Sequence, residues 1–283
     1  MIPCQVWVGT SGYSYPEWIK AGFYPPGTRA GQMLTRYAQL FSVTELNHTW
    51  YQMPQPELVD RQRLAAPSSF LFATKLTRTM THEVDEARWP EEVATYRRGI
   101  VPLVESRQLV AVLVQLPNRF HRSPTNRTYL ARLLDELGDL PVAVEFRNAS
   151  WLNDRVFAEL ERRRVTLVTV DGPRLPGLFP SLDAVTHPDL VYARFHGRNT
   201  QGWYSGSKNQ QFDYDYRQDE LAEWVETRLE RMARRARRAF VFFNNHVAAQ
   251  APRDAEILEG LLRRQGFQVV SPRGGGGRGQ RTR

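Results

Sequence analysis

Short apolar runs that stop abruptly on a polar or ionisable residue recur along the chain. Buried strands of a parallel sheet have this continuous apolar composition, because other elements cover both of their faces. The runs occupy residues 6–8, 41–44, 70–73, 111–114, 142–144, 166–170, 191–193 and 240–243. We therefore expect eight parallel strands, each followed by polar side chains at its carboxyl end.

Segments with a helical periodicity of apolar positions lie between these runs. They occupy residues 31–40, 56–66, 90–106, 126–137, 151–164, 219–238 and 253–265. After the sixth run the periodicity fails, and residues 172–190, which contain four prolines, are expected to be an irregular segment in place of a helix. The alternation predicts an α/β fold, a TIM-like (β/α)8 barrel rather than an open doubly wound sheet.

Length and composition are typical of one barrel domain, which we place at residues 1–270. The 283 residues suit a single (β/α)8 barrel, and no apolar stretch is long enough to span a bilayer. The single cysteine, Cys4, opens an apolar strand and is expected in the core, where it forms no intrachain disulfide. Since the first residues lack the pattern of a secretion signal, we expect a cytoplasmic protein without a membrane partner.

Basic residues give the chain a formal net charge of +8, and half of this excess lies in its last residues. Residues 271–283 are rich in glycine, carry four arginines and no acid, and are expected to be disordered. A second basic run, at residues 231–238, closes the helix predicted for residues 219–238. Both runs suit nucleic-acid contact, but we favour a solvated helix end for residues 231–238, and a solubilising tail explains residues 271–283 at least as well.

Polar residues after the predicted strands form the candidate site, since the carboxyl ends of barrel strands open at one mouth. Acid–base chemistry assigns catalytic roles to Glu45, Glu145, His196 and Asp171. Substrate binding is assigned to Lys75, Arg147, Arg194, Gln115, Asn47, Asn244, Asn245, His246, Tyr13, Trp203 and Tyr204. Burial is expected to raise the pKa of both glutamates, and His196 is expected to shuttle protons near neutral pH. A structural ion pair between Glu145 and Arg147, which share a strand face, is the alternative.

Two further chemistries stay open at these strand ends. Lys75 suits a Schiff base as well as the binding of a carboxylate or phosphate. Acceptable ligands for a divalent metal are Glu45, His82, Glu145, Asp171, His196 and His246. Because no H-x-H or H-E-x-x-H spacing occurs among them, no cofactor is predicted, and a divalent metal is kept as an alternative.

Eight short motifs make the chain resemble a known family. They are Gly9–Trp18, Glu45–Tyr51, Lys75 with Thr81–His82, Gln115–Pro117, Glu145–Arg147 with Ser150–Trp151, Arg194–Gly197, Trp203–Gly206 and Asn244–His246. Over residues 5–268 these motifs and their order are similar to the YecE-like family, also called domain of unknown function 72. The resemblance implies a TIM-like barrel and no particular reaction. Asn148 and Trp50 depart from the His and Phe that are usual in the family.

The favoured hypothesis is an enzyme, a hydrolase or an isomerase or lyase of unknown specificity, that acts on a small polar substrate. The arginines suit a phosphate-like group and the aromatic side chains suit a sugar. One alternative is a nucleic-acid-binding protein or a metal-dependent phosphodiesterase on the plan of endonuclease IV. The other is a non-catalytic protein that binds a small ligand.

Overall fold

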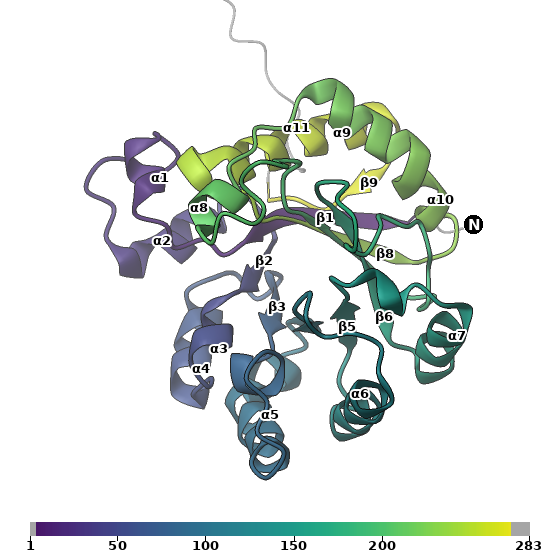
Figure 1. Ribbon diagram of the computed structural model, residues 1–283. Coiled ribbons are helices and arrows are strands. Elements are labelled where there is room, and N and C mark those ends of the chain that lie inside the picture. The colour runs from purple at the N-terminus through teal and green to yellow at the C-terminus, as the bar shows by residue number, and fades with distance from the viewer. Residues whose placement is uncertain (1–3, 273–283) are drawn as a thin grey trace, which may run out of the picture.

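Eight parallel strands close into a barrel in the computed structural model, which describes residues 4–272 (Figure 1). They are β1 (Gln5–Ser11), β2 (Val43–Leu46), β3 (Leu71–Lys75), β4 (Leu109–Gln115), β5 (Val142–Glu145), β6 (Thr166–Asp171), β7 (Val191–Phe195) and β8 (Arg238–Phe243). Because β1 pairs with both β2 and β8, the sheet closes on itself and the predicted TIM-like (β/α)8 barrel is confirmed. A short strand that the sequence pattern does not predict, β9 (Gln268–Val269), pairs with β1.

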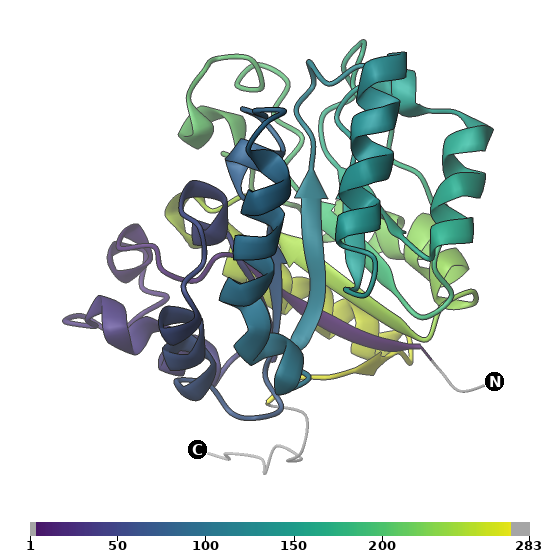
Figure 2. The same ribbon diagram turned by 90° about the horizontal axis from the view of Figure 1, so that it is seen from below.

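Helices surround the barrel, as the two views in Figures 1 and 2 show. The longer ones are α2 (Ala30–Tyr37), α4 (Pro56–Leu64), α5 (Trp89–Glu105), α6 (Pro124–Glu136), α7 (Asp154–Arg163) and α11 (Gln250–Arg264). Their ends lie within three residues of the predicted ones. The short helices α1 (Glu17–Lys20), α3 (His48–Tyr51) and α8 (Lys208–Gln211) follow β1, β2 and β7, and therefore belong to the loops at the carboxyl ends of the strands.

The helix predicted for residues 219–238 is shorter and irregular. It consists of α9 (Gln218–Trp224), a π-helical turn at Val225–Leu229 and α10 (Glu230–Ala233). The prediction that the helix extends to residue 238 is wrong. The helix ends at Ala233, because β8 begins at Arg238 and the chain has to turn between the two. Two arginines of the basic run form ion pairs with Asp183 and Asp189.

Residues 172–190 form the irregular segment that the prolines predict, without a helix or a strand. Leu178 of this segment forms an isolated bridge with Asn148. Near the other end, the Thr186 hydroxyl accepts from the Leu167 N–H and donates to the Val165 carbonyl, both at the start of β6. Hydrogen bonds thus hold the segment to the barrel at two places, beside β5 and β6.

Side chains along each strand alternate between the barrel interior and the layer between strands and helices. Trp7 stacks on Phe240 in the interior cluster, whereas Phe195 packs on Trp224 of α9 outside it. Cys4 is buried, as predicted. Within residues 4–272, no helix is both long enough and apolar enough to cross a membrane. The predicted disorder of residues 271–283 concerns a tail whose residues 273–283 lie outside the described residues.

Candidate functional site

A buried arginine connects two strand ends at the floor of the barrel mouth. Arg194, on β7, donates from Nε and Nη2 to the two carboxylate oxygens of Glu45, at 3.0 and 2.6 Å. Its Nη1 donates to Glu145 on β5 at 2.7 Å. Tyr192 also donates its hydroxyl to Glu45, at 2.7 Å. The three charged side chains are at most 2% exposed, so each depends on its partners for the interactions that water would otherwise supply.

Arg147 extends this floor from β5 toward β7 and β8. Its Nε lies 2.5 Å from the Glu145 carboxylate, and its Nη2 lies 2.9 Å from Nε2 of His196. The same Nε2 lies 3.2 Å from the Glu145 carboxylate, and Nδ1 of the ring lies 3.1 Å from the side-chain nitrogen of Asn244. The imidazole is therefore fixed on both sides.

The pKa values of two floor residues, Glu145 and His196, differ from those that the sequence predicts. Burial raises the pKa of Glu145, but Arg147 and Arg194 outweigh it and hold that pKa well below its usual range. The predicted increase for this glutamate is wrong, because two guanidiniums distant in sequence lie directly on it. Burial and Arg147 lower the pKa of His196 to about 3. The prediction that His196 shuttles protons near neutral pH is therefore wrong.

Lys75, at the end of β3, differs from every charge of the floor. Its ammonium lies 4.9 Å from the centre of the Trp50 ring and forms no hydrogen bond or ion pair with any side chain in residues 4–272. Burial and the positive charge of Arg194 lower the pKa of Lys75 to about 7, against the opposing effect of the two glutamates. Near pH 7 a large fraction of this amine is neutral and carries a free lone pair.

A cavity of about 590 Å³ lies above this floor, and its described lining is cationic. Four basic side chains line it, namely Lys75, Arg147, Arg194 and Lys208, and no aspartate or glutamate does. Aromatic side chains form much of the remaining wall, namely Tyr15, Trp50, Tyr51, Trp203, Tyr204 and Phe212. Such a lining favours an anionic ligand with a flat or ring-shaped body.

The structure brings most, but not all, of the predicted site residues to this mouth. Those that line the cavity are Asn47, Lys75, Gln115, Arg147, Arg194, Trp203, Tyr204, Asn244 and His246. Glu45, Glu145 and His196 are fully buried. The two glutamates contact lining arginines, and His196 contacts Arg147 and Asn244 of the lining. Tyr13, Asp171 and Asn245 lie elsewhere.

The three outlying residues each have an identifiable partner. Asp171 pairs in register with outward-facing Phe195, and therefore points away from the barrel interior toward Arg198, which binds it through two nitrogens at 2.9 and 2.8 Å. Asn245, next to Asn244, is buried and donates to Asp254 of α11 at 2.6 Å. Tyr13 accepts from Gln62 of α4 at 3.2 Å. The expectation that they share the mouth is therefore wrong for all three.

Sequence reasoning missed Lys208 of α8 as a member of the lining. Its ammonium lies 2.6 Å from the Tyr51 hydroxyl and 4.8 Å from the centre of the Trp50 ring. One signal points to it, since the chain has only three lysines, Lys20, Lys75 and Lys208, among its 38 basic residues. Two of these three lie in the cavity.

The predicted metal ligands are not gathered at one place. In the part of the chain that the structure describes, no group of three or more His, Cys, Asp or Glu side chains is arranged to hold a metal ion. The oxygens of Glu45 and Glu145 are taken by guanidiniums and hydroxyls. His246 instead stacks on Tyr15, with 5.0 Å between ring centres.

Strand order and cavity together define a class of protein, a (β/α)8 barrel with a cationic, aromatic-walled cavity at the carboxyl ends of its strands. Residues 7–275 match the family described as protein of unknown function DUF72, and the chain belongs to this family. The resemblance to the YecE-like family is thereby confirmed.

Named relatives match between 64% and 92% of this chain. UPF0759 protein YunF of Bacillus subtilis (strain 168) is 28% identical over 272 residues, which are 91% of this chain and 95% of YunF. UPF0759 protein YecE of Escherichia coli (strain K12) is 25% identical over 187 residues, 64% of either chain. The crystal structure of a DUF72 family protein from Thermotoga maritima MSB8 has a TM-score of 0.82 at 33% identity, over 92% of this chain and 99% of that chain.

Proposed function

We propose that the protein is an enzyme that binds a small anionic substrate in the barrel mouth and moves a proton of that substrate with the amine of Lys75. The observation that carries this proposal is the pairing of charges around the cavity. The carboxylates are held by arginines below the lining, whereas Lys75 faces the cavity beside the Trp50 ring and without a hydrogen-bond or ion-pair partner among the described residues.

A lysine with a pKa of about 7 suits a general base, because a base is most effective when its pKa lies near the working pH. The electrophilic partner is Arg147, which lines the cavity and whose Nη1 has no hydrogen bond within residues 4–272. A donor at that place stabilises the oxyanion that forms when a proton is removed beside a carbonyl or carboxylate. Isomerases and lyases use this chemistry, so we favour them over hydrolases.

The buried groups of the floor then act as positioning residues. Glu145 has a pKa too low for a general base, and neutral His196 has one too low for an acid near pH 7. Both contact Arg147 and fix the direction in which its guanidinium points. Glu45 holds Arg194 in the same manner.

Solvent deuterium exchange tests the proposal. Small phosphorylated sugars and hydroxycarboxylates are screened for stabilisation of the protein in thermal unfolding, since a ligand that binds the folded state raises Tm. Ligands that bind are incubated in D2O and followed by NMR. We expect the wild type to incorporate deuterium at a carbon of the ligand, and Lys75→Met to bind the ligand without exchange. Exchange that persists in Lys75→Met contradicts the proposal.

The two alternatives give different results in the same work. A non-catalytic binding protein binds a ligand and shows no exchange in either form. A nucleic-acid protein binds DNA with a steep salt dependence, and it does so in a chain shortened to residue 271 if the barrel, rather than the basic tail, makes the contacts. The exposed ring of Tyr204 at the cavity wall is the feature that favours base stacking.

A further inference from the structure

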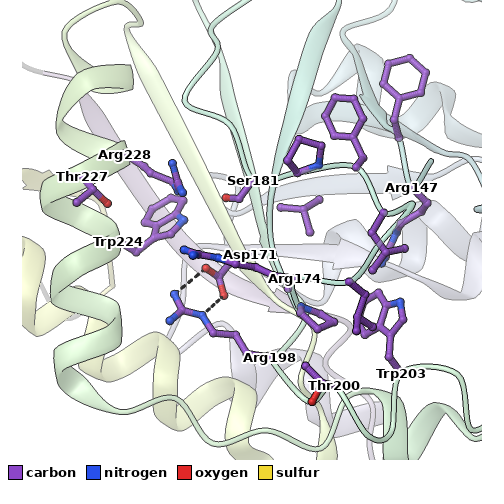
Figure 3. Close-up of a pocket in the computed structure, with 18 of the residues that line it drawn as sticks. Arg147, Asp171, Arg174, Ser181, Arg198, Thr200, Trp203, Trp224, Thr227 and Arg228 are labelled. Atoms are coloured by element: carbon purple, nitrogen blue, oxygen red, sulfur yellow. Dashed lines mark hydrogen bonds and ion pairs between the residues drawn. The ribbon is translucent and has the colours of Figure 1, made fainter. Parts of the chain in front are cut away.

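A second cavity, of about 720 Å³, lies beside the mouth and shares three lining residues with it. The shared residues are Arg147, Leu178 and Trp203. The guanidinium carbon of Arg147 lies 5.4 Å from the centre of the Trp203 ring. Figure 3 shows Arg147 and Trp203 at one end of this cavity and Trp224, Thr227 and Arg228 at the other.

Hydrogen-bond donors without a partner among the described residues line this cavity. The indole N–H of Trp224 has no partner among residues 4–272, although this side chain is 98% buried. The hydroxyl of Ser181 is buried and equally without a partner there. The guanidiniums of Arg174, which is exposed, and Arg228, which is half-buried, line the same cavity and form no hydrogen bond or ion pair within the described chain. An unsatisfied buried donor costs free energy, which a ligand with acceptor atoms would recover.

The acids of this cavity do not cancel its charge. Asp171 accepts two hydrogen bonds from Arg198, at 2.9 and 2.8 Å, and one from the Tyr216 hydroxyl, at 2.7 Å. Its carboxylate is therefore already bonded within the wall, by a guanidinium that also contacts Glu220 at 3.4 Å. Glu223 is exposed and is the other acid of the described lining. Arg174 and Arg228 thus supply positive charge that is not already used.

The backbone places these donors by an irregularity of the helix. Thr227 and Arg228 belong to the π-helical turn Val225–Leu229, which follows Trp224. π-Helical turns within α-helices are rare and often occur at functional sites. The opposite wall is the proline-rich segment that contributes Arg174 and Ser181.

We infer that this second cavity binds the phosphate group of the substrate, with Arg174, Arg228, Ser181 and Trp224 as its donors. Guanidinium and indole N–H groups can only donate, so the ligand must offer several acceptors and a negative charge, as a phosphate monoester does. Because the cavity continues into the mouth at Arg147 and Trp203, one phosphorylated molecule would occupy both. That last step rests on the proposed function, whereas phosphate binding at the donors does not.

Inorganic phosphate is the probe for this inference. Its dissociation constant is measured by calorimetry at pH 7.5 and constant ionic strength, with acetate as the carboxylate comparison. The test variant is Arg174→Gln/Arg228→Gln. The matched control is Arg127→Gln/Arg155→Gln, which removes the same charge from two exposed arginines on α6 and α7 whose side chains form no hydrogen bond or ion pair within residues 4–272.

We expect the test variant to weaken phosphate binding at least about tenfold, the scale of one lost charge-assisted hydrogen bond. The matched control should bind as the wild type does. Trp224→Phe, which keeps an aromatic side chain but replaces the indole and its N–H by a smaller ring, should weaken binding by a smaller factor. Circular dichroism of each variant shows that it is folded.

Lys75→Met separates this inference from the proposed function. It should leave the binding of inorganic phosphate unchanged. If instead Lys75→Met abolishes phosphate binding and the double arginine variant does not, the anion binds in the mouth and the second cavity is not its site. Absence of binding to the wild type, or equal affinity for acetate, overturns the assignment to phosphate.

Discussion

The floor and the wall of the barrel mouth use the same kinds of charged residue in opposite ways. On the floor, Arg194 is surrounded by Glu45, Glu145 and the Tyr192 hydroxyl, and none of these charges is free. On the wall, Lys75 faces the cavity with an aromatic ring as its neighbour and no carboxylate. Both regions lie at strand ends, so position in the fold does not separate a structural charge from a reactive one, whereas its partners do.

Removal of the shared cation should have the largest effect on stability. Arg194→Met leaves Glu45 and Glu145 buried with fewer donors, and breaking a buried pair by removing one partner costs about 3–5 kcal/mol. Urea denaturation measures the free energy of unfolding. Arg198→Met, which removes a partner of Asp171 that is 28% exposed, is the comparison and should cost less. A loss below about 1 kcal/mol for Arg194→Met would show that the floor is not held by this pairing.

Removal of one acceptor should have the next largest effect. Glu145→Gln keeps the shape of the side chain but removes the charge that faces both Arg147 and Arg194, and we expect a loss of about 2–4 kcal/mol. It should also lower the pKa of Lys75 further, since Glu145 raises that pKa. The same denaturation experiment applies. Unchanged stability would return Glu145 to the role of a general base that sequence reasoning gave it.

Replacement of Lys75 should increase the free energy of unfolding, whereas the two preceding variants should decrease it. Folding lowers the pKa of Lys75 from 10.5 to about 7, so between these values the unfolded chain binds a proton that the folded protein does not. Stability of the wild type therefore rises with pH across this window. Lys75→Met should be more stable than the wild type at pH 7, and the gain should shrink toward pH 10.5. Lys20→Met, on the exposed α1, should show no such trend.

The smallest effect on stability is expected from replacement of His196, at acidic pH. The pKa of His196 is lowered from 6.5 to about 3. Between these values His196 binds a proton in the unfolded chain and stays neutral in the folded protein. This residue destabilises the fold progressively as the pH falls from 6.5 to 3. His196→Asn should flatten the fall of stability in that range, and His121→Asn, at an exposed position, should not. Parallel curves for wild type and His196→Asn would contradict the assignment.

Much of the fold follows from the sequence because local pattern and barrel geometry agree. Eight apolar runs became eight strands, and the prolines of residues 172–190 marked the segment without a helix. The failure at residues 231–238 has a local cause, since helical periodicity does not show where the next strand must begin. The sequence therefore predicts the single barrel of residues 4–272. It predicts the first and last residues of each helix and strand less well.

The sequence predicts where the site lies, at the carboxyl ends of the strands. It does not predict the role of each residue there. Asp171 was assigned to the mouth because it ends a strand, but its register with Phe195 turns it outward. The pKa of Glu145 depends on Arg194, which is 49 residues away in sequence and 2.7 Å away in space. Such long-range pairing is set by strand register and loop length, neither of which can be read from residue types alone.

The titration of Lys75 tests the central claim most directly. With three lysines in the chain, ¹³C labelling of the lysine side chains gives three sets of signals, and Lys20→Arg and Lys208→Arg assign them. The chemical shift of each ε-carbon is followed between pH 5 and pH 11. We predict that Lys75 titrates near pH 7, three to four pH units below an ordinary lysine. A midpoint near pH 10.5 would contradict the account, because the unpaired amine would then be an ordinary cation.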